Sequence, residues 1–334
     1  MHQYSEHERA DFRRFSKLLT WAASLTFGLI CLGSLVRASN SGLSCPDWPL
    51  CYGKAVPLFD THIFLEWFHR VVAASLACLM ITAGVKLIRS RLLRRLFTIQ
   101  LSASAALLSI QIVLGGLTVL KLLDPATVSA HLINALLFFT VLVWMAMRAH
   151  SLATEPDTQE HIPTPLSIRA GFITATFLMF VQIGIGGTVS SRYAGLACPD
   201  FPTCNGSFMV PPNLPQALQM LHRGFALLLF IYTCCLSTFG SRIRLPSSAR
   251  RAVRLVPLLV LAQIGLGMIN IYFSLPIWAS ALHLANAAAL YSLLLLASID
   301  LLAQRKGYHH GAISRHNSAA EGGKRFVAQL PTTH

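Results

Sequence analysis

Charged side chains are scarce in this sequence of 334 residues, since Asp, Glu, Lys and Arg together make up 12% of it. Soluble domains carry about 25% charged residues. Hydrophobic residues account for 54% of the chain. A soluble protein of this composition would have too little polar surface to cover itself, so the composition indicates a membrane protein.

Two further absences narrow the class of protein. Neither a basic helix nor a zinc-finger signature accompanies the net charge of +14, so the charge does not indicate nucleic-acid binding. Lys and Arg instead stand in short runs between apolar stretches, which is information about membrane topology. No small-residue cleavage site follows a short apolar core near the N-terminus, so we expect the first apolar stretch to be a retained span rather than a cleaved signal peptide.

Eight apolar segments are long enough to cross a membrane, which takes about 20 residues. We expect spans at 16–37, 65–88, 95–119, 125–149, 167–189, 216–239, 251–273 and 278–303. The polar, proline-bearing segment 151–166 is interpreted as a cytoplasmic linker, and the tail 305–334 is expected to be disordered.

The basic residues predict the orientation of the chain. They concentrate in 9–17, 86–95, 242–254 and 305–306. The loops on the other side hold only Lys54, Lys121 and Arg192. Because positively charged loops stay in the cytoplasm, we expect a multi-pass protein of the bacterial inner membrane with both termini cytoplasmic.

The second half of the chain repeats the first. "GSLVRASNSGLSCPDWPLCYG" (33–53) aligns with "GGTVSSRYAGLACPDFPTCNG" (186–206), and "EWFHRVVA" (66–73) aligns with "QMLHRGFA" (219–226). Both halves, 1–150 and 167–304, hold four spans and begin on the same side, which is typical of parallel repeats. The sequence therefore predicts an all-α membrane protein of two tandem four-helix bundles, related by a pseudo-two-fold axis along the membrane normal.

Each half carries one outward loop bracketed by cysteines, Cys45 and Cys51 in "CPDWPLC" and Cys198 and Cys204 in "CPDFPTC". Disulfides persist outside the cell, so we expect both pairs to be closed. Free thiols or a metal site are the alternatives, but metal-binding pairs usually stand closer, as CxxC. The other cysteines are interpreted as inert apolar residues of the spans; they are Cys31, Cys78, Cys234 and Cys235.

Four histidines lie within the spans, as one pair in each half: His69 with His131, and His222 with His283. Each is expected about four to six residues below the outer end of its helix, a shared depth somewhat under 10 Å. A lone histidine there would fit an interhelical hydrogen bond. Two matched pairs favour axial ligation of haem iron, whereas zinc would need further ligands. His62, in the outer loop, is interpreted as solvated.

Several neighbouring residues fit a haem site less specifically. Arg70 and Arg223 each follow a histidine and could pair with haem propionates or extend toward lipid headgroups. Four glycines could let a macrocycle approach the backbone, although close helix contacts are the safer interpretation; they are Gly115, Gly116, Gly186 and Gly187.

One difference between the halves predicts a difference in their roles. Glu66 precedes His69 by three residues and shares its helical face, whereas the matching residue of the second half is Gln219. We expect Glu66 to be catalytic, as a group that transfers protons; a structural hydrogen bond to His69 or to a neighbouring arginine is the alternative.

Together these motifs resemble the haem A synthase family over residues 16–303, because the histidines, the glutamate and the cysteines all fall in the same order. The resemblance implies oxidation of the C8 methyl of haem O to a formyl group, with water as the oxygen source, giving haem A for cytochrome oxidase. It implies haem b (iron) as cofactor at His222 and His283, and the substrate haem O at His69 and His131. It also implies that Cys45–Cys51 is linked to activity more closely than Cys198–Cys204.

The expected partners are haem O, membrane lipid, haem O synthase and an electron acceptor of unknown identity, with oligomers possible and nucleic acid excluded. Two other functions fit part of the pattern. A di-haem electron-transfer cytochrome explains the four histidines but not why Glu66 occurs in one half only. A haem carrier without catalysis explains the arginines but not the cysteine loops.

Overall fold

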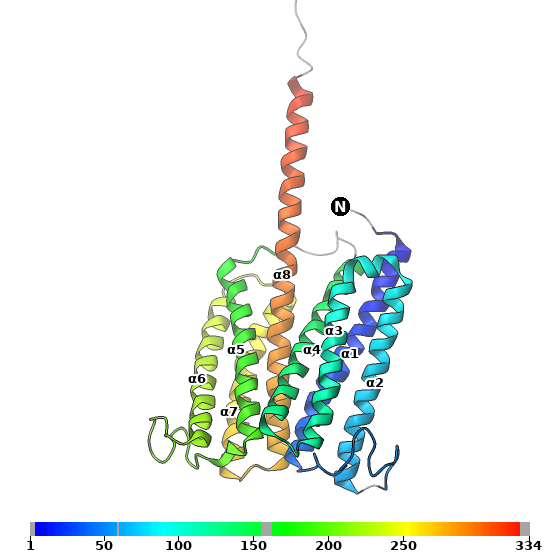
Figure 1. Ribbon diagram of the computed structural model, residues 1–334. Coiled ribbons are helices and arrows are strands. Elements are labelled where there is room, and N and C mark those ends of the chain that lie inside the picture. Colours follow the sequence, from blue (N-terminus) through cyan, green and yellow to red (C-terminus); the bar gives the residue numbers. More distant parts are fainter. Residues whose placement is uncertain (1–3, 59, 155–161, 328–334) are drawn as a thin grey trace, which may run out of the picture.

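The computed structural model describes all of the chain except residues 1–3, 59, 155–161 and 328–334, with the backbone alone for 304–327. The long elements are helices (Figure 1): α1 (Glu6–Ala38), α2 (Thr61–Arg89), α3 (Arg91–Leu120), α4 (Pro125–Ala153), α5 (Leu166–Ser191), α6 (Leu214–Gly240), α7 (Ser247–Tyr272) and α8 (Ile277–Val327). A short 3₁₀ helix, η2 (Ala194–Leu196), follows α5. Within the described residues, eight helices are long and apolar enough to cross a membrane. The expected all-α, multi-pass class is confirmed.

Some helices extend beyond the apolar segments because polar residues cap them. Ser5 begins α1 through a capping box with Glu8, and the Asp60 side chain accepts a hydrogen bond of 2.8 Å from the Ile63 N–H at the start of α2. α8 continues past the membrane span to Val327, so much of the tail expected to be disordered is helical here. Extending an existing helix needs no new nucleation. Of the expected linker 151–166, residues 155–161 lie outside the described part.

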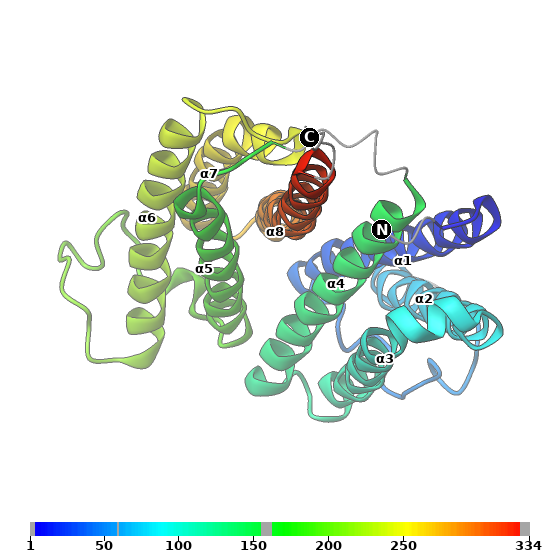
Figure 2. The same ribbon diagram turned by 90° about the horizontal axis from the view of Figure 1, so that it is seen from above.

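The helices form two groups of four, seen along their axes in Figure 2. In the first group, α1 and α3 each pack against both α2 and α4. In the second, α5 and α7 each pack against both α6 and α8. The groups meet where α1 packs on α8 and α4 on α5. Figure 1 shows the two cysteine loops at one end of the bundle and the N-terminal end of α1 at the other.

Aromatic and hydroxyl side chains join the two groups. The Tyr291 ring of α8 lies 6.5 Å from Phe139 of α4 and 6.2 Å from Phe180 of α5. Its hydroxyl is 2.6 Å from Thr140 Oγ1. Large apolar side chains such as Trp21 and Ile99 are exposed on the outside of the bundle, as expected for surface that faces lipid.

Candidate functional site

Each cysteine loop is closed into a ring by a disulfide, Cys45–Cys51 between α1 and α2 and Cys198–Cys204 between α5 and α6. Both predicted pairings are confirmed. We call residues 45–54 the first cysteine ring and 198–207 the second. Trp48–Pro49 and Phe201–Pro202 are cis peptide bonds at matching positions of the two rings.

An aspartate organises the inside of each ring. Asp47 accepts hydrogen bonds from the N–H groups of Tyr52 (2.6 Å) and Gly53 (2.8 Å). Asp200 accepts the equivalent bonds from Asn205 (2.7 Å) and Gly206 (3.0 Å). Tyr52 and Gly53 have positive φ, as do their counterparts in the second ring. The motif CPD-x-P-x-C therefore encodes a turn that the aspartate closes.

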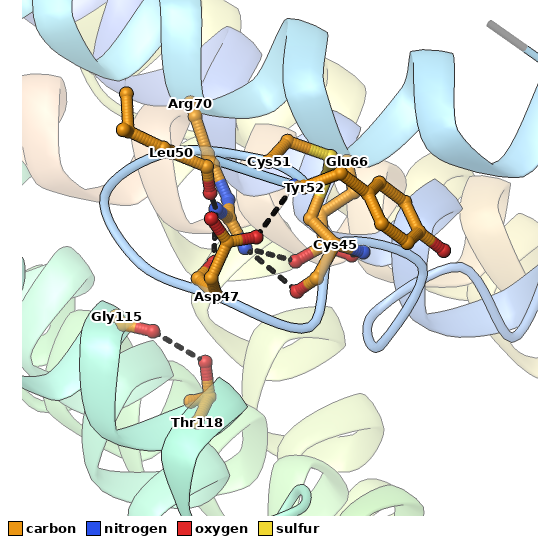
Figure 3. A network of polar contacts seen from close by, with 9 residues as sticks. All are labelled: Cys45, Asp47, Leu50, Cys51, Tyr52, Glu66, Arg70, Gly115 and Thr118. Atoms are coloured by element: carbon orange, nitrogen blue, oxygen red, sulfur yellow. Dashed lines mark hydrogen bonds and ion pairs between the residues drawn. A yellow bond between two sulfur atoms is a disulfide. The ribbon is translucent and has the colours of Figure 1, made fainter. Parts of the chain in front are cut away.

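An arginine from the following helix holds each ring in place, as Figure 3 shows for the first ring. Arg70 Nη1 donates to the carbonyl oxygens of Asp47 (2.8 Å) and Leu50 (2.5 Å), and Nη2 donates to that of Cys45 (3.3 Å). Arg223 of α6 makes the same three bonds in the second ring, to Asp200, Thr203 and Cys198. The sequence suggested propionates or lipid headgroups as partners of both guanidinium groups, whereas in the structure these groups bind ring carbonyls.

Glu66 is buried between Arg70 and the first ring. Its Oε1 lies 2.6 Å from Arg70 Nη2, and its Oε2 accepts a 2.8 Å hydrogen bond from the Cys45 N–H. The structure thus contains the hydrogen bond to a neighbouring arginine that was the alternative to a catalytic role. Gln219, equally buried, donates instead to the Gly195 carbonyl at 2.6 Å, so the ion pair occurs in the first half alone among the described residues.

His62 is exposed, as the sequence predicted, but it lies in the first turn of α2 rather than in a loop. Its Nδ1 lies 2.9 Å from Ser41 Oγ, which in turn lies 2.7 Å from Ser39 Oγ. α2 begins at Thr61 and so places His62 next to the residues that follow α1.

The four span histidines lie in diagonally opposed helices. α2 (His69) and α4 (His131) both pack on α1 and α3, so they face each other across the first bundle. α6 (His222) and α8 (His283) are opposed in the same way. The rings of His222 and His283 have centroids 6.4 Å apart and planes 58° apart.

Each of these histidines packs against a glycine of the preceding helix. A Cβ added at Gly33 would lie 3.4 Å from His69 Cε1, and one at Gly186 only 2.9 Å from His222 Cε1. The corresponding distances are 3.2 Å from Gly115 to His131 and 3.4 Å from Gly267 to His283. Each imidazole ring therefore packs directly against the backbone of a glycine, and we call these four glycines the glycine seats. Gly116 and Gly187 instead contact Trp48 and Leu132, so close packing, the safer interpretation, fits all of them.

The donor set fits haem better than zinc. Two imidazoles that bind one metal ion from opposite sides at about 2 Å place their ring centres roughly 6 Å apart, which matches the 6.4 Å between His222 and His283. Buried Nδ1 atoms of His69, His131 and His283 have no hydrogen-bond partner. Within the described residues, no three His, Cys, Asp or Glu side chains come together to form a metal cluster.

Known proteins are similar to this chain over most of its length. The family described as "Cytochrome oxidase assembly protein" (COX15-CtaA) matches residues 16–63 and 58–295. The chain belongs to this family. It is 25% identical to the Heme A synthase of Shewanella oneidensis over 84% of this chain and 96% of that protein. It is 27% identical to that of Rhizorhabdus wittichii over 86% and 95%, and 30% identical to that of Bacillus pumilus over 60% and 66%.

Side-chain amides that were not predicted from the sequence lie around the histidines. Gln182 Nε2 lies 3.1 Å from His222 Nδ1, and Gln111 Nε2 lies 3.3 Å from His131 Nε2. Gln263 Nε2 donates to the His283 carbonyl at 2.9 Å. The repeated "QIVLGG" and "QIGLGM" contained this signal, because Gln111 and Gln263 each stand four residues before a glycine seat.

The pKa values of the two aspartates predict how the stability of the cysteine rings depends on pH. The Thr203 hydroxyl and the Gly206 N–H lower the pKa of Asp200 to about 2, and the Gly53 N–H lowers the pKa of Asp47. A carboxyl whose pKa is lower in the folded protein stabilises it above the unfolded pKa of about 3.9. This stabilisation is lost as the pH falls toward 2. We therefore expect Cys198–Cys204 to resist a phosphine reductant equally from pH 5 to 8 and to become easier to reduce below pH 4.

Mass spectrometry of the alkylated cysteines, normalised to an exposed disulfide peptide, would measure that rate. The Asp200→Asn variant is the control and should lose the dependence below pH 4. Equal reduction rates at pH 3 and pH 7 in the unmodified chain would contradict the prediction.

Proposed function

We propose that this chain is a haem A synthase, a membrane oxidoreductase that oxidises the C8 methyl of haem O to a formyl group. The observation that carries the proposal is the family match over 16–63 and 58–295, joined to two diagonal histidine pairs. With water as the oxygen source, a methyl group and one water give a formyl group, four electrons and four protons. The electrons pass to an external acceptor, and haem A goes to cytochrome oxidase.

The two halves, 1–150 and 167–304, act in this proposal as tandem repeats joined by the linker 151–166. The same order of helix packing in each group supports it. So do the matched glycine seats, with Gly33 corresponding to Gly186 and Gly115 to Gly267, and the shared hydrogen bonds of the cysteine rings. A pseudo-two-fold axis along the membrane normal relates such repeats.

The halves differ in what they bind. His222 and His283 hold haem b, which supplies one-electron redox chemistry when bound. Gln182 of α5 donates through its Nε2 to the His222 carbonyl, and the same nitrogen lies 3.1 Å from Nδ1 of that ring. His69 and His131 bind the substrate haem O. The residue of α1 that corresponds to Gln182 is Leu29, so these contacts have no counterpart at His69.

Glu66 connects the substrate site to the first cysteine ring. It lies three residues before His69, on the same face of α2. As the proton-accepting or water-positioning group, it would take up a proton by releasing Arg70 or the Cys45 N–H, because a neutral carboxyl no longer forms the ion pair. A proton taken from the substrate would thereby loosen the ring, which makes Cys45–Cys51 the ring that matters for activity.

We further propose the bacterial inner membrane as the location, with both termini cytoplasmic and both rings outside. The position of the rings at the end opposite the start of α1 supports this orientation (Figure 1). Haem O synthase, an electron acceptor and the surrounding lipid are the proposed partners.

Pigment analysis tests the function. The chain is expressed in a bacterium that makes haem O but no haem A. The extracted haems are separated by reversed-phase chromatography and identified by mass spectrometry. We expect haem A in cells with the chain and none with the empty vector. Two haem b per purified chain, with neither haem O nor haem A, would instead identify a di-haem cytochrome.

A further inference from the structure

Gln111 and Gln263 occupy matching positions in α3 and α7 but bind different atoms of the neighbouring histidine. The Gln111 amide nitrogen lies 3.3 Å from Nε2 of the His131 ring. The Gln263 amide nitrogen donates to the backbone carbonyl of His283 at 2.9 Å instead of to its ring. The hydrogen bond to a ring nitrogen therefore occurs at His131, one of the two histidines assigned to the substrate.

A neighbouring asparagine fixes which way each glutamine amide points. Asn134 Nδ2 donates to the Leu107 carbonyl (2.9 Å) and to Gln111 Oε1 (2.7 Å). A backbone carbonyl can only accept, so the asparagine presents its NH₂ group and the glutamine presents its oxygen in return. The NH₂ group of Gln111 is therefore the one that faces His131. Asn286 orients Gln263 through the same two bonds in the second half.

This orientation determines the tautomer of His131. Since Gln111 donates, His131 Nε2 accepts, and the ring proton is on Nδ1, which is buried and has no partner. A neutral imidazole binds a metal through its unprotonated nitrogen. The Gln111 N–H and a haem iron therefore compete for the same lone pair of His131.

We propose that Gln111 is a positioning residue that keeps His131 a displaceable axial ligand; this inference rests on the proposed function. The distance of 3.3 Å is long for a hydrogen bond, so the competition is weak enough for iron to bind. The carbonyl of His131 offers Gln111 the alternative acceptor that Gln263 already uses on His283. A substrate must leave its site after oxidation, whereas a resident cofactor must stay, and the two glutamines match these needs.

The test compares Gln111→Leu with Gln263→Leu in the full-length chain in lipid nanodiscs, loaded with haem b as the probe. Both variants lose an equivalent bond to an asparagine, but only the first removes a donor from a histidine ring nitrogen. Transfer of haem to excess apomyoglobin gives the dissociation rate of each site, and His131→Ala identifies which phase belongs to the first half. Gln111→Ala serves as a second variant if the leucine prevents folding.

We expect Gln111→Leu to slow dissociation from the first half roughly five- to tenfold, the effect of one competing hydrogen bond, and to raise its ferric low-spin fraction. Gln263→Leu should leave the second-half rate within about twofold. An unchanged or faster first-half rate in Gln111→Leu would overturn the proposal, as would a His131→Ala variant that loses no pigment. A chain that makes no haem A but shows the expected rates would refute the synthase function alone.

Discussion

The His222→Ala variant should lose the low-spin haem b of the protein, while His69→Ala should keep it. The His222 and His283 rings stand 6.4 Å apart on diagonal helices, so removing one of them leaves an iron with a single protein ligand. We expect the low-spin signal to fall below about a tenth of the wild-type amount, because axial ligation sets the haem's state. Reduced-minus-oxidised spectra, with haem counted per chain as the pyridine complex, measure this.

A matched control guards against a general effect of losing a histidine. His150 lies in the last turn of α4, at the end of the helix far from His131, and is exposed. His150→Ala should therefore retain the full haem b content. A His222→Ala protein with an undiminished low-spin spectrum would refute His222 as a ligand.

The second large effect concerns Glu66. Glu66→Ala should lower haem A production at least about 100-fold, the contribution of a proton-transferring group. It also leaves the Cys45 N–H and one side of Arg70 without a partner, which costs about 1–3 kcal/mol for each buried group. Gln219→Ala removes one neutral hydrogen bond in the second half and should change production by less than about threefold.

Glu66→Gln separates the two roles of the carboxylate. The amide oxygen can still accept from Arg70 or from the Cys45 N–H, but the side chain can no longer take up a proton. If Glu66 transfers protons, Glu66→Gln makes no more haem A than Glu66→Ala, although its first ring is reduced more slowly than that of Glu66→Ala. Haem A production at the normal rate in Glu66→Gln would limit Glu66 to holding the ring.

Much of the fold could be predicted from the sequence because a membrane imposes simple rules. Apolar segments of about 20 residues must be helices in lipid, and this rule located eight spans. The loops between them carry no such constraint. Thus the early start of α2 at Thr61, which brings His62 to Ser41, depends on the cap at Asp60 rather than on hydropathy.

The candidate site was predictable in its residue types but not in its contacts. Histidines, cysteines and Glu66 are conspicuous because the residues around them are apolar. The repeat in the sequence also showed which histidines and cysteines correspond between the halves. That Arg70 binds three ring carbonyls depends on how the ring folds back over α2. The roles of Gly33 and Gly267 were equally hidden, because a glycine seat is visible only once the neighbouring helix is in place.

The glycine seats have a consequence for how such a protein can evolve. If the halves are repeats, as proposed, both contain the parts that fix the position of the ligands. These parts are the glycine seats, the histidines and the cysteine rings. What differs is carried by single side chains, among them Glu66 against Gln219 and Gln182 against Leu29. A duplicated electron-carrying ancestor could thus acquire a reaction in one copy by a few substitutions, while the other copy continued to hold its pigment and neither had to refold.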